Sequence, residues 1–256
     1  MNIFVLKLIM APLIIGSASL AGRRWGEAVS GWIVGMPLTS GPVVFFVAIT
    51  EGATFAKDAS LGVLSGGFSL VIYALTYAWL ATRFRWPIAI TGSLLLFGIS
   101  TTLLQNASFP LVPLFLAVIA AIALGLYLMP KGEVVQANDR EPGRWDLPAR
   151  ILIGTSFILL LTGSASFIGP RLTGLLATIP LYVTILSIFA HQQQGPAAAA
   201  HVLRGLLYGM FAFAGFFITL GLLIEHAGIA ASFLAATVAA LAIQGMSLWV
   251  LSHMQK

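Results

Sequence analysis

The sequence contains no cysteine and little charge, and both absences narrow what the protein can be. Without cysteine, neither a disulfide nor a thiolate metal site can form. Charged residues make up 8% of the 256 residues, whereas a soluble domain carries about 25%. The chain is 59% hydrophobic, with a mean hydropathy of +0.99. These values predict an integral membrane protein, and the net charge of +5 does not indicate a nucleic-acid partner.

Motifs of the common enzyme classes are also missing. The chain has no Gly-x-Ser-x-Gly nucleophile elbow, no Gly-x-x-x-x-Gly-Lys phosphate loop and no His-Glu-x-x-His pair. His191 and His201 are expected to flank a polar loop, and without acidic neighbours they are poor metal ligands. We therefore expect no enzyme activity, no cofactor and no metal.

Long apolar runs predict an all-α polytopic bundle with nine transmembrane helices, because each run far exceeds the roughly 10 residues of a barrel strand. The first run could instead be a signal peptide, since small residues follow it. Arg23 and Arg24 directly after it favour a retained helix. The expected spans are residues 3–22, 28–50, 59–82, 87–105, 109–130, 149–168, 172–191, 203–225 and 227–252.

The distribution of basic residues predicts the orientation of these spans. Ten of the 13 lysines and arginines follow odd-numbered spans, and Lys7, Lys57 and Arg171 lie on the other side. The positive-inside rule then places the N-terminus outside, the C-terminus in the cytoplasm and the polar linker 131–148 in the cytoplasm.

The chain also contains an internal repeat. Residues 26–80 align without gaps with residues 169–223, at an offset of 143. The two windows hold 8 and 7 glycines over 55 positions, so chance gives about one coincidence, yet five glycines coincide. Pro37 also aligns with Pro180. Residues 143 apart are called equivalent below.

Equivalent positions are five spans apart, and five is odd, so the two copies are expected to be inverted relative to each other. The sequence thus divides into a first four-helix repeat (1–108), a connector helix (109–130), the linker (131–148) and a second four-helix repeat (149–256). Inverted repeats of this kind are typical of secondary transporters.

Each repeat contains a span broken by proline. The first break holds Pro37, Thr39, Ser40, Gly41 and Pro42, and the second holds Pro180, Tyr182 and Thr184. Proline removes a backbone hydrogen bond, and paired breaks in two repeats point to a transporter's binding site. The alternative is a pair of merely kinked helices, whose hydroxyls bond back to their own backbone. We favour a substrate site formed by all eight residues.

Small residues recur four apart at Gly31 and Gly35, at Gly62 and Gly66, and at Gly205 and Gly209. Such pairs let helix backbones approach closely. They are expected to pack spans against one another inside the chain, with a ligand role or a homodimer face as the alternatives.

The stretch from Gly174 to Leu181, together with Ile188–His191, Gly195 and Gly205–Met210, resembles the core of the GlpM-like small bacterial inner-membrane proteins. Those proteins are about the size of one repeat. The resemblance implies a bacterial inner-membrane location and a history of duplication and fusion. It assigns no functional residue.

These features favour a small secondary transporter or exporter with a site between spans 2 and 7. The apolar residues around this site predict an amphipathic, lipid-like or weakly charged substrate. Membrane lipid is expected to surround the protein. The alternatives are a flippase for lipid or lipid-linked intermediates, which needs a lateral opening, and a non-transporting scaffold subunit of an envelope-synthesis system.

Overall fold

The computed structural model describes residues 9, 12–13, 32–104, 109–130 and 146–254. Within these residues the regular structure is helical and contains no strand, which confirms the all-α prediction. The first expected span and most of the linker lie outside the described residues. The helices are α3 (Ser40–Glu51), α4 (Ala53–Ala81), α5 (Trp86–Leu104), α6 (Leu111–Leu128), α7 (Asp146–Ile168), α8 (Pro170–Leu176), α9 (Leu181–Gln194) and α10 (Pro196–Met254).

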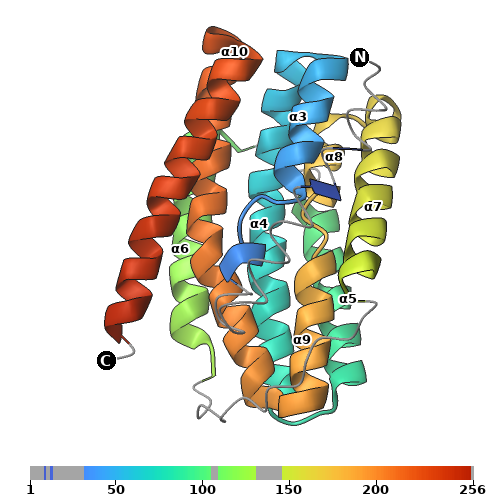
Figure 1. Ribbon diagram of the computed structural model, residues 1–256, viewed down its shortest axis with the longest axis vertical. Helices are drawn as coiled ribbons and strands as arrows, with labels where there is room; N and C mark the ends of the chain where they lie inside the picture. The colour runs from blue at the N-terminus through green and yellow to red at the C-terminus, as the bar shows by residue number, and fades with distance from the viewer. Residues whose placement is uncertain (1–8, 10–11, 14–31, 105–108, 131–145, 255–256) are drawn as a thin grey trace.

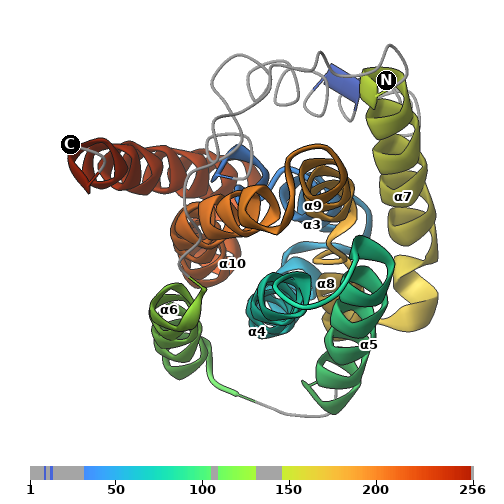
Figure 2. The ribbon, with the colours of Figure 1, turned by 90° about the horizontal axis from the view of Figure 1, so that it is seen from below.

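Six helical segments of the described chain are long and apolar enough to cross a membrane, so the prediction of a membrane helix bundle is confirmed. They differ in how much of their length the protein itself covers. The apolar windows of α4 and α10 are 72% and 67% buried, against 28% in α5, 22% in α6 and 33% in α7. α4 and the first half of α10 therefore form the centre, and the other helices leave large apolar side chains for lipid (Figures 1 and 2).

The helix labelled α10 is two helices joined at a sharp bend. Gly228 has φ 77° and ψ 170°, a backbone conformation that interrupts the helix and suits glycine. The chain then folds back, so that a methyl group on Gly215 would collide with Ile243. This bend falls where the sequence predicts the boundary between the last two spans.

Two other expected boundaries were wrong by nearly two helical turns. The structure begins α4 at Ala53 and α10 at Pro196, where loops were expected. Single glycines make both turns: Gly52 (φ 96°, ψ 175°) and Gly195 (φ 94°, ψ −178°), which are equivalent residues. Because one glycine is enough to reverse the chain, the alanine-containing residues directly after it can already form the first turn of the next helix. The chain does turn between His191 and His201, but the turn is the single residue Gly195, so the expectation of a polar loop there was wrong and both histidines lie within helices.

The central helices meet the two broken spans at glycines. A methyl group on Gly35 would lie 2.7 Å from Cα of Gly209. One on Gly174 would lie 2.7 Å from the backbone nitrogen of Val63, and one on Gly66 would lie 3.0 Å from Cβ of Thr178. No side chain fits at such contacts. The expectation that glycines spaced four apart pack spans together inside the chain is confirmed for Gly35, Gly62, Gly66 and Gly209, and Gly174 is a further such position.

The glycine contacts predict that Gly174→Ala and Gly209→Ala will each lower the free energy of unfolding in detergent by about 1–3 kcal/mol, the usual cost of overpacking. The added methyl meets backbone in both cases, which cannot move aside as a side chain can. Gly98→Ala and Gly163→Ala are the matched controls, because nothing lies within 4 Å of the added carbon. Equal stability in all four variants would contradict the close packing.

Candidate functional site

Both broken spans contain the same kind of turn. Pro180 has φ −79° and ψ 53°, close to an inverse γ-turn, and the N–H of Leu181 donates to the carbonyl of Ile179 at 2.8 Å. At Pro37 the N–H of Leu38 donates to the carbonyl of Met36 at 2.7 Å. Each proline thus stands at the centre of a tight turn between two helical pieces.

The hydrogen bonds around the two breaks agree residue by residue. Five backbone bonds outside the regular helices recur at the offset of 143. They are Met36 N to Ile33 O and Ile179 N to Leu176 O, Leu38 N to Met36 O and Leu181 N to Ile179 O, Gly41 N to Pro37 O and Thr184 N to Pro180 O, Gly52 N to Ala48 O and Gly195 N to His191 O, and Ala56 N to Gly52 O and Ala199 N to Gly195 O. The resemblance seen in the sequence therefore extends to backbone conformation.

The two breaks meet at one pocket of about 40 Å³, which has room for about three water molecules. Besides Pro180 and Leu206, its lining consists of seven pairs of equivalent residues. The pairs are Val34 and Ala177, Gly35 and Thr178, Met36 and Ile179, Leu38 and Leu181, Thr39 and Tyr182, Ser40 and Val183, and Leu70 and Phe213. The pocket therefore lies between the two broken spans and is lined largely by equivalent positions.

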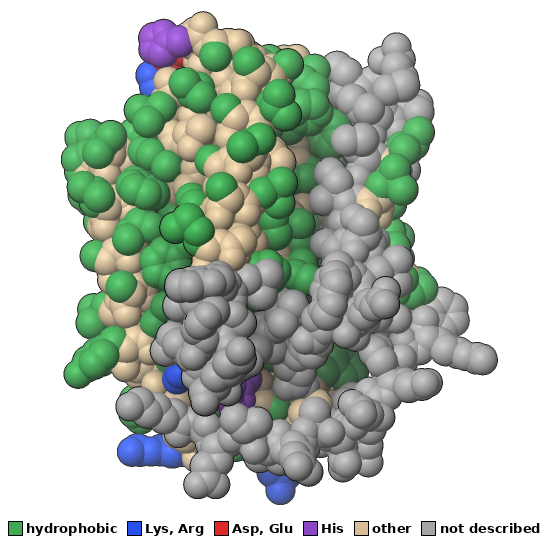
Figure 3. All heavy atoms as spheres, turned by 60° about the vertical axis from the view of Figure 1, so that its left-hand side comes forward, with side chains coloured by type: hydrophobic (Ala, Val, Ile, Leu, Met, Phe, Trp, Pro, Cys, Tyr) green, Lys and Arg blue, Asp and Glu red, His purple; other side chains and the backbone are tan. Residues whose placement is uncertain are grey.

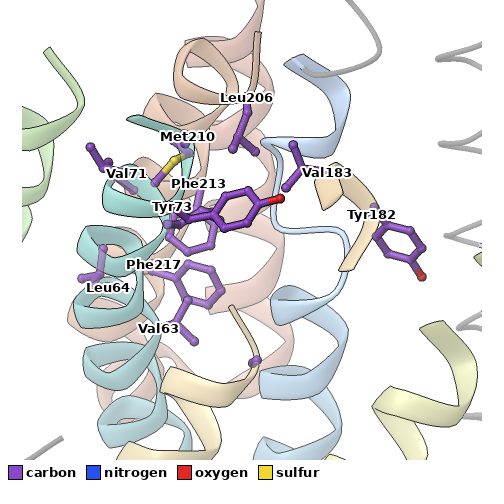
Figure 4. Packing of buried hydrophobic residues seen from close by; sticks show 14 of the residues in the cluster. Val63, Leu64, Val71, Tyr73, Tyr182, Val183, Leu206, Met210, Phe213 and Phe217 are labelled. Carbon is purple, nitrogen blue, oxygen red and sulfur yellow. The ribbon is translucent and has the colours of Figure 1, made fainter. Parts of the chain in front are cut away.

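Four of the eight residues expected at the site line this pocket: Thr39, Ser40, Pro180 and Tyr182. Ser40 and Tyr182 are buried, at 3% and 7% exposure, so neither side chain faces lipid. The ring of Tyr182 points away from Tyr73 and toward α7 (Figure 4). It bounds one side of the pocket rather than filling its centre.

The other four expected residues, Pro37, Gly41, Pro42 and Thr184, are not among the residues that line the pocket. Pro37 stands at the centre of the turn, and a Cβ added at Gly41 would lie 3.8 Å from the ring of Phe216, an ordinary van der Waals contact. In a regular helix the N–H of residue 42 would donate to the carbonyl of Leu38. Pro42 has no N–H, so the carbonyl of Leu38, a residue of the pocket lining, does not receive that bond. This carbonyl is an additional hydrogen-bond acceptor at the first break.

Thr184 bonds to a residue that the sequence did not single out. Its hydroxyl lies 2.9 Å from the hydroxyl of Tyr73 on α4. One turn further along, the hydroxyl of Tyr77 lies 3.5 Å from Nδ1 of His191. Tyr73 and Tyr77 share one face of α4, and that spacing was the available signal. Which helix would face them could not be read from spacing alone.

Charged side chains lie at the ends of the bundle. Lys57 on α4 pairs with Glu225 on α10 at one end. At the other end Arg204 donates to the carbonyls of Met129 (3.4 Å) and Pro130 (3.3 Å), just beyond α6. Lys and Arg side chains also gather toward the two ends in the space-filling view (Figure 3). The described lining of the pocket contains hydroxyls and backbone groups but no Asp, Glu, Lys or Arg.

Comparison with known proteins adds no relative: no family model, no curated protein and no solved structure matches the chain. The likeness to GlpM-like proteins stays a prediction.

The bond between Tyr73 and Thr184 predicts a measurable coupling between the two hydroxyls. Interhelical hydrogen bonds in membranes average about 0.6 kcal/mol and reach about 1.7 kcal/mol. A double-mutant cycle with Tyr73→Phe and Thr184→Val should give a coupling in this range for the free energy of unfolding in detergent. Tyr127→Phe is the control, because that side chain is 84% exposed to the bundle's surroundings. Strictly additive effects would contradict the bond.

Proposed function

We propose that the chain is a small secondary transporter or exporter, with its substrate site at the pocket between the two proline breaks. The observation that carries this proposal is the pocket's lining, seven pairs of equivalent residues from two interrupted helices. Transporters with inverted repeats bind substrate where their interrupted helices meet.

The proposal includes nine spans in two inverted repeats joined by α6. The matched backbone bonds around Pro37 and Pro180 support it, as do the equivalent turns at Gly52 and Gly195. The position of α6 supports it too, because this helix touches the central helix of each repeat. A methyl group on Gly125 of α6 would lie 3.0 Å from Val71 and 3.2 Å from Leu207. A connector between two symmetric halves belongs at such a position.

The site suits an amphipathic or weakly charged substrate. Leu70 and Phe213 give it apolar walls, and Thr39, Ser40 and the Leu38 carbonyl give it hydrogen-bonding groups. A volume of about 40 Å³ is too small for most metabolites. The described conformation is therefore a nearly closed one, and binding requires the two halves to move apart.

The expected orientation is tested first. The basic bias places residue 138 in the cytoplasm and residue 53 on the opposite side. In this cysteine-free chain, the Asn138→Cys and Ala53→Cys variants should react with a membrane-impermeant thiol reagent from opposite sides of oriented vesicles. Reaction of both variants from the same side would refute the nine-span topology with an external N-terminus.

Alternating access is tested at the pocket itself. The Thr39→Cys variant should react with the impermeant reagent when it is added from either side, because a transporter opens its site to each side in turn. Val118→Cys is the control, since Val118 is fully buried between α6 and the central helices. If a folded Thr39→Cys variant reacts from neither side, transport through this pocket is contradicted and the scaffold alternative leads.

A further inference from the structure

The interface between α4 and α9, called the polar seam below, carries a line of hydrogen-bonding side chains. Tyr73 and Tyr77 contribute from α4, and Thr184, Ser187 and His191 contribute from α9. Two contacts cross the seam: the hydroxyl of Tyr73 lies 2.9 Å from that of Thr184, and the hydroxyl of Tyr77 lies 3.5 Å from Nδ1 of His191. The rings of Tyr77 and His191 also meet edge to face, with centroids 6.0 Å apart.

The faces of α4 and α9 that form the polar seam also carry Ser69 and Ser187, whose hydroxyls have no hydrogen-bond partner among the described residues. Ser187 follows Thr184 by three residues and precedes His191 by four, so helical spacing places all three on one face of α9. Ser69 precedes Tyr73 by four residues on α4. Both serines are fully buried, and their hydroxyls are unpaired. An unpaired buried hydroxyl costs about 1–3 kcal/mol, which points to water or a ligand reaching the seam.

The equivalent interface, between α3 and the first half of α10, is the apolar seam. Each polar residue is replaced there by one without a hydrogen-bonding side chain. The replacements are Phe216 for Tyr73, Leu220 for Tyr77, Gly41 for Thr184, Val44 for Ser187 and Ala48 for His191. Val44, Ala48 and Leu220 are at most 1% exposed. A group of phenylalanine rings closes the area, with Phe45 and Phe216 packed edge to face on Phe233 at 5.1 and 6.0 Å.

The two seams lead from the pocket to opposite ends of the bundle. Along the polar seam, α4 passes from Leu70 in the pocket to its end at Ala81, just before Arg83 and Arg85. Along the apolar seam, α3 passes from Ser40 in the pocket to Glu51, on the side of the ion pair between Lys57 and Glu225. A line of polar side chains thus runs from beside the pocket toward the arginine-bearing end, and a line of apolar side chains runs toward the other end.

We propose that the polar seam is the passage by which an uncharged, hydrogen-bonding part of the substrate enters or leaves the pocket at the arginine-bearing end. Tyr77 and His191 form its outer gate, and the apolar seam is the seal on the other side. This inference rests on the proposed transport function and adds the route and the chemistry of the substrate group. Hydroxyl or amide groups fit best, because the seam offers them donors and acceptors in turn.

The chemistry of the seam disfavours an ionic group. No Asp, Glu, Lys or Arg lies among its five residues or in the described lining of the pocket. A bare ion there would lose its hydration without a countercharge, at a cost of several kcal/mol. A neutral polyol or amide headgroup loses only hydrogen bonds to water, and the seam can replace them.

Equivalent positions offer a matched test of the two seams. Ser187→Cys and Val44→Cys place a thiol at equivalent sites, both fully buried, one on each seam. An impermeant thiol reagent is added from each side, and rates are normalised to those of the denatured protein. Ser187→Cys should react from the arginine-bearing side about tenfold faster than Val44→Cys reacts from the opposite side. A tenfold ratio of rates corresponds to a difference of about 1.4 kcal/mol in the free energy needed to expose the thiol to the reagent.

The Thr39→Cys variant, measured in parallel, separates failure of this inference from failure of the proposed function. If Thr39→Cys reacts from both sides while Ser187→Cys reacts no faster than Val44→Cys, the pocket is used but the polar seam is not its route. If Thr39→Cys reacts from neither side, the proposed transport function itself fails. Faster reaction of Val44→Cys than of Ser187→Cys would reverse the assignment of passage and seal.

Discussion

A backbone group freed inside a membrane must find a partner within the protein, and the rest of this structure depends on that constraint. Pro37 and Pro180 each interrupt a helix in the apolar interior. A tight turn across each proline satisfies part of the released backbone. At the first break Pro42 has no N–H, so the carbonyl of Leu38, a residue of the pocket lining, lacks the usual helical donor. Polarity in the centre of this bundle therefore comes from interrupted backbone and hydroxyls rather than from buried charge.

The interrupted helices can meet only because the central helices let them approach. Gly35 lies against Gly209, and the equivalent contact brings Thr178 against Gly66. One such contact is glycine on glycine, and the other includes a threonine whose hydroxyl donates to the carbonyl of Leu175 at 2.6 Å. Both Gly35 and Thr178 also line the pocket. Residues at these close helix contacts are thus also residues of the pocket lining, so under the proposed function a motion between the two broken spans would change the pocket directly.

Apolar run length and shared glycine and proline positions predicted the described helices and the places where two of them break. These features act locally, since a proline interrupts its own helix wherever that helix packs. The early starts at Ala53 and Pro196 were missed because neither alanine-rich turn carries an apolar pattern. The pairing of Tyr73 with Thr184 was missed for another reason: it depends on which helices become neighbours. Spacing along one helix defines a face but does not identify the partner of that face.

The two broken spans share their backbone hydrogen bonds and differ in the side chains of the two seams, and the proposed transport depends on this difference. Distances between spin labels at equivalent places test alternating access most directly. One pair, at Arg83 and Gln192, spans the end of the polar seam, and the equivalent pair, at His226 and Ile49, spans the other end; all four side chains are exposed. Alternating access predicts two populations of spin-label distance at each end, a longer one when that end is open and a shorter one when it is closed. Conditions that favour the longer distance at one end should favour the shorter distance at the other. A single unchanging distance at both ends would contradict it.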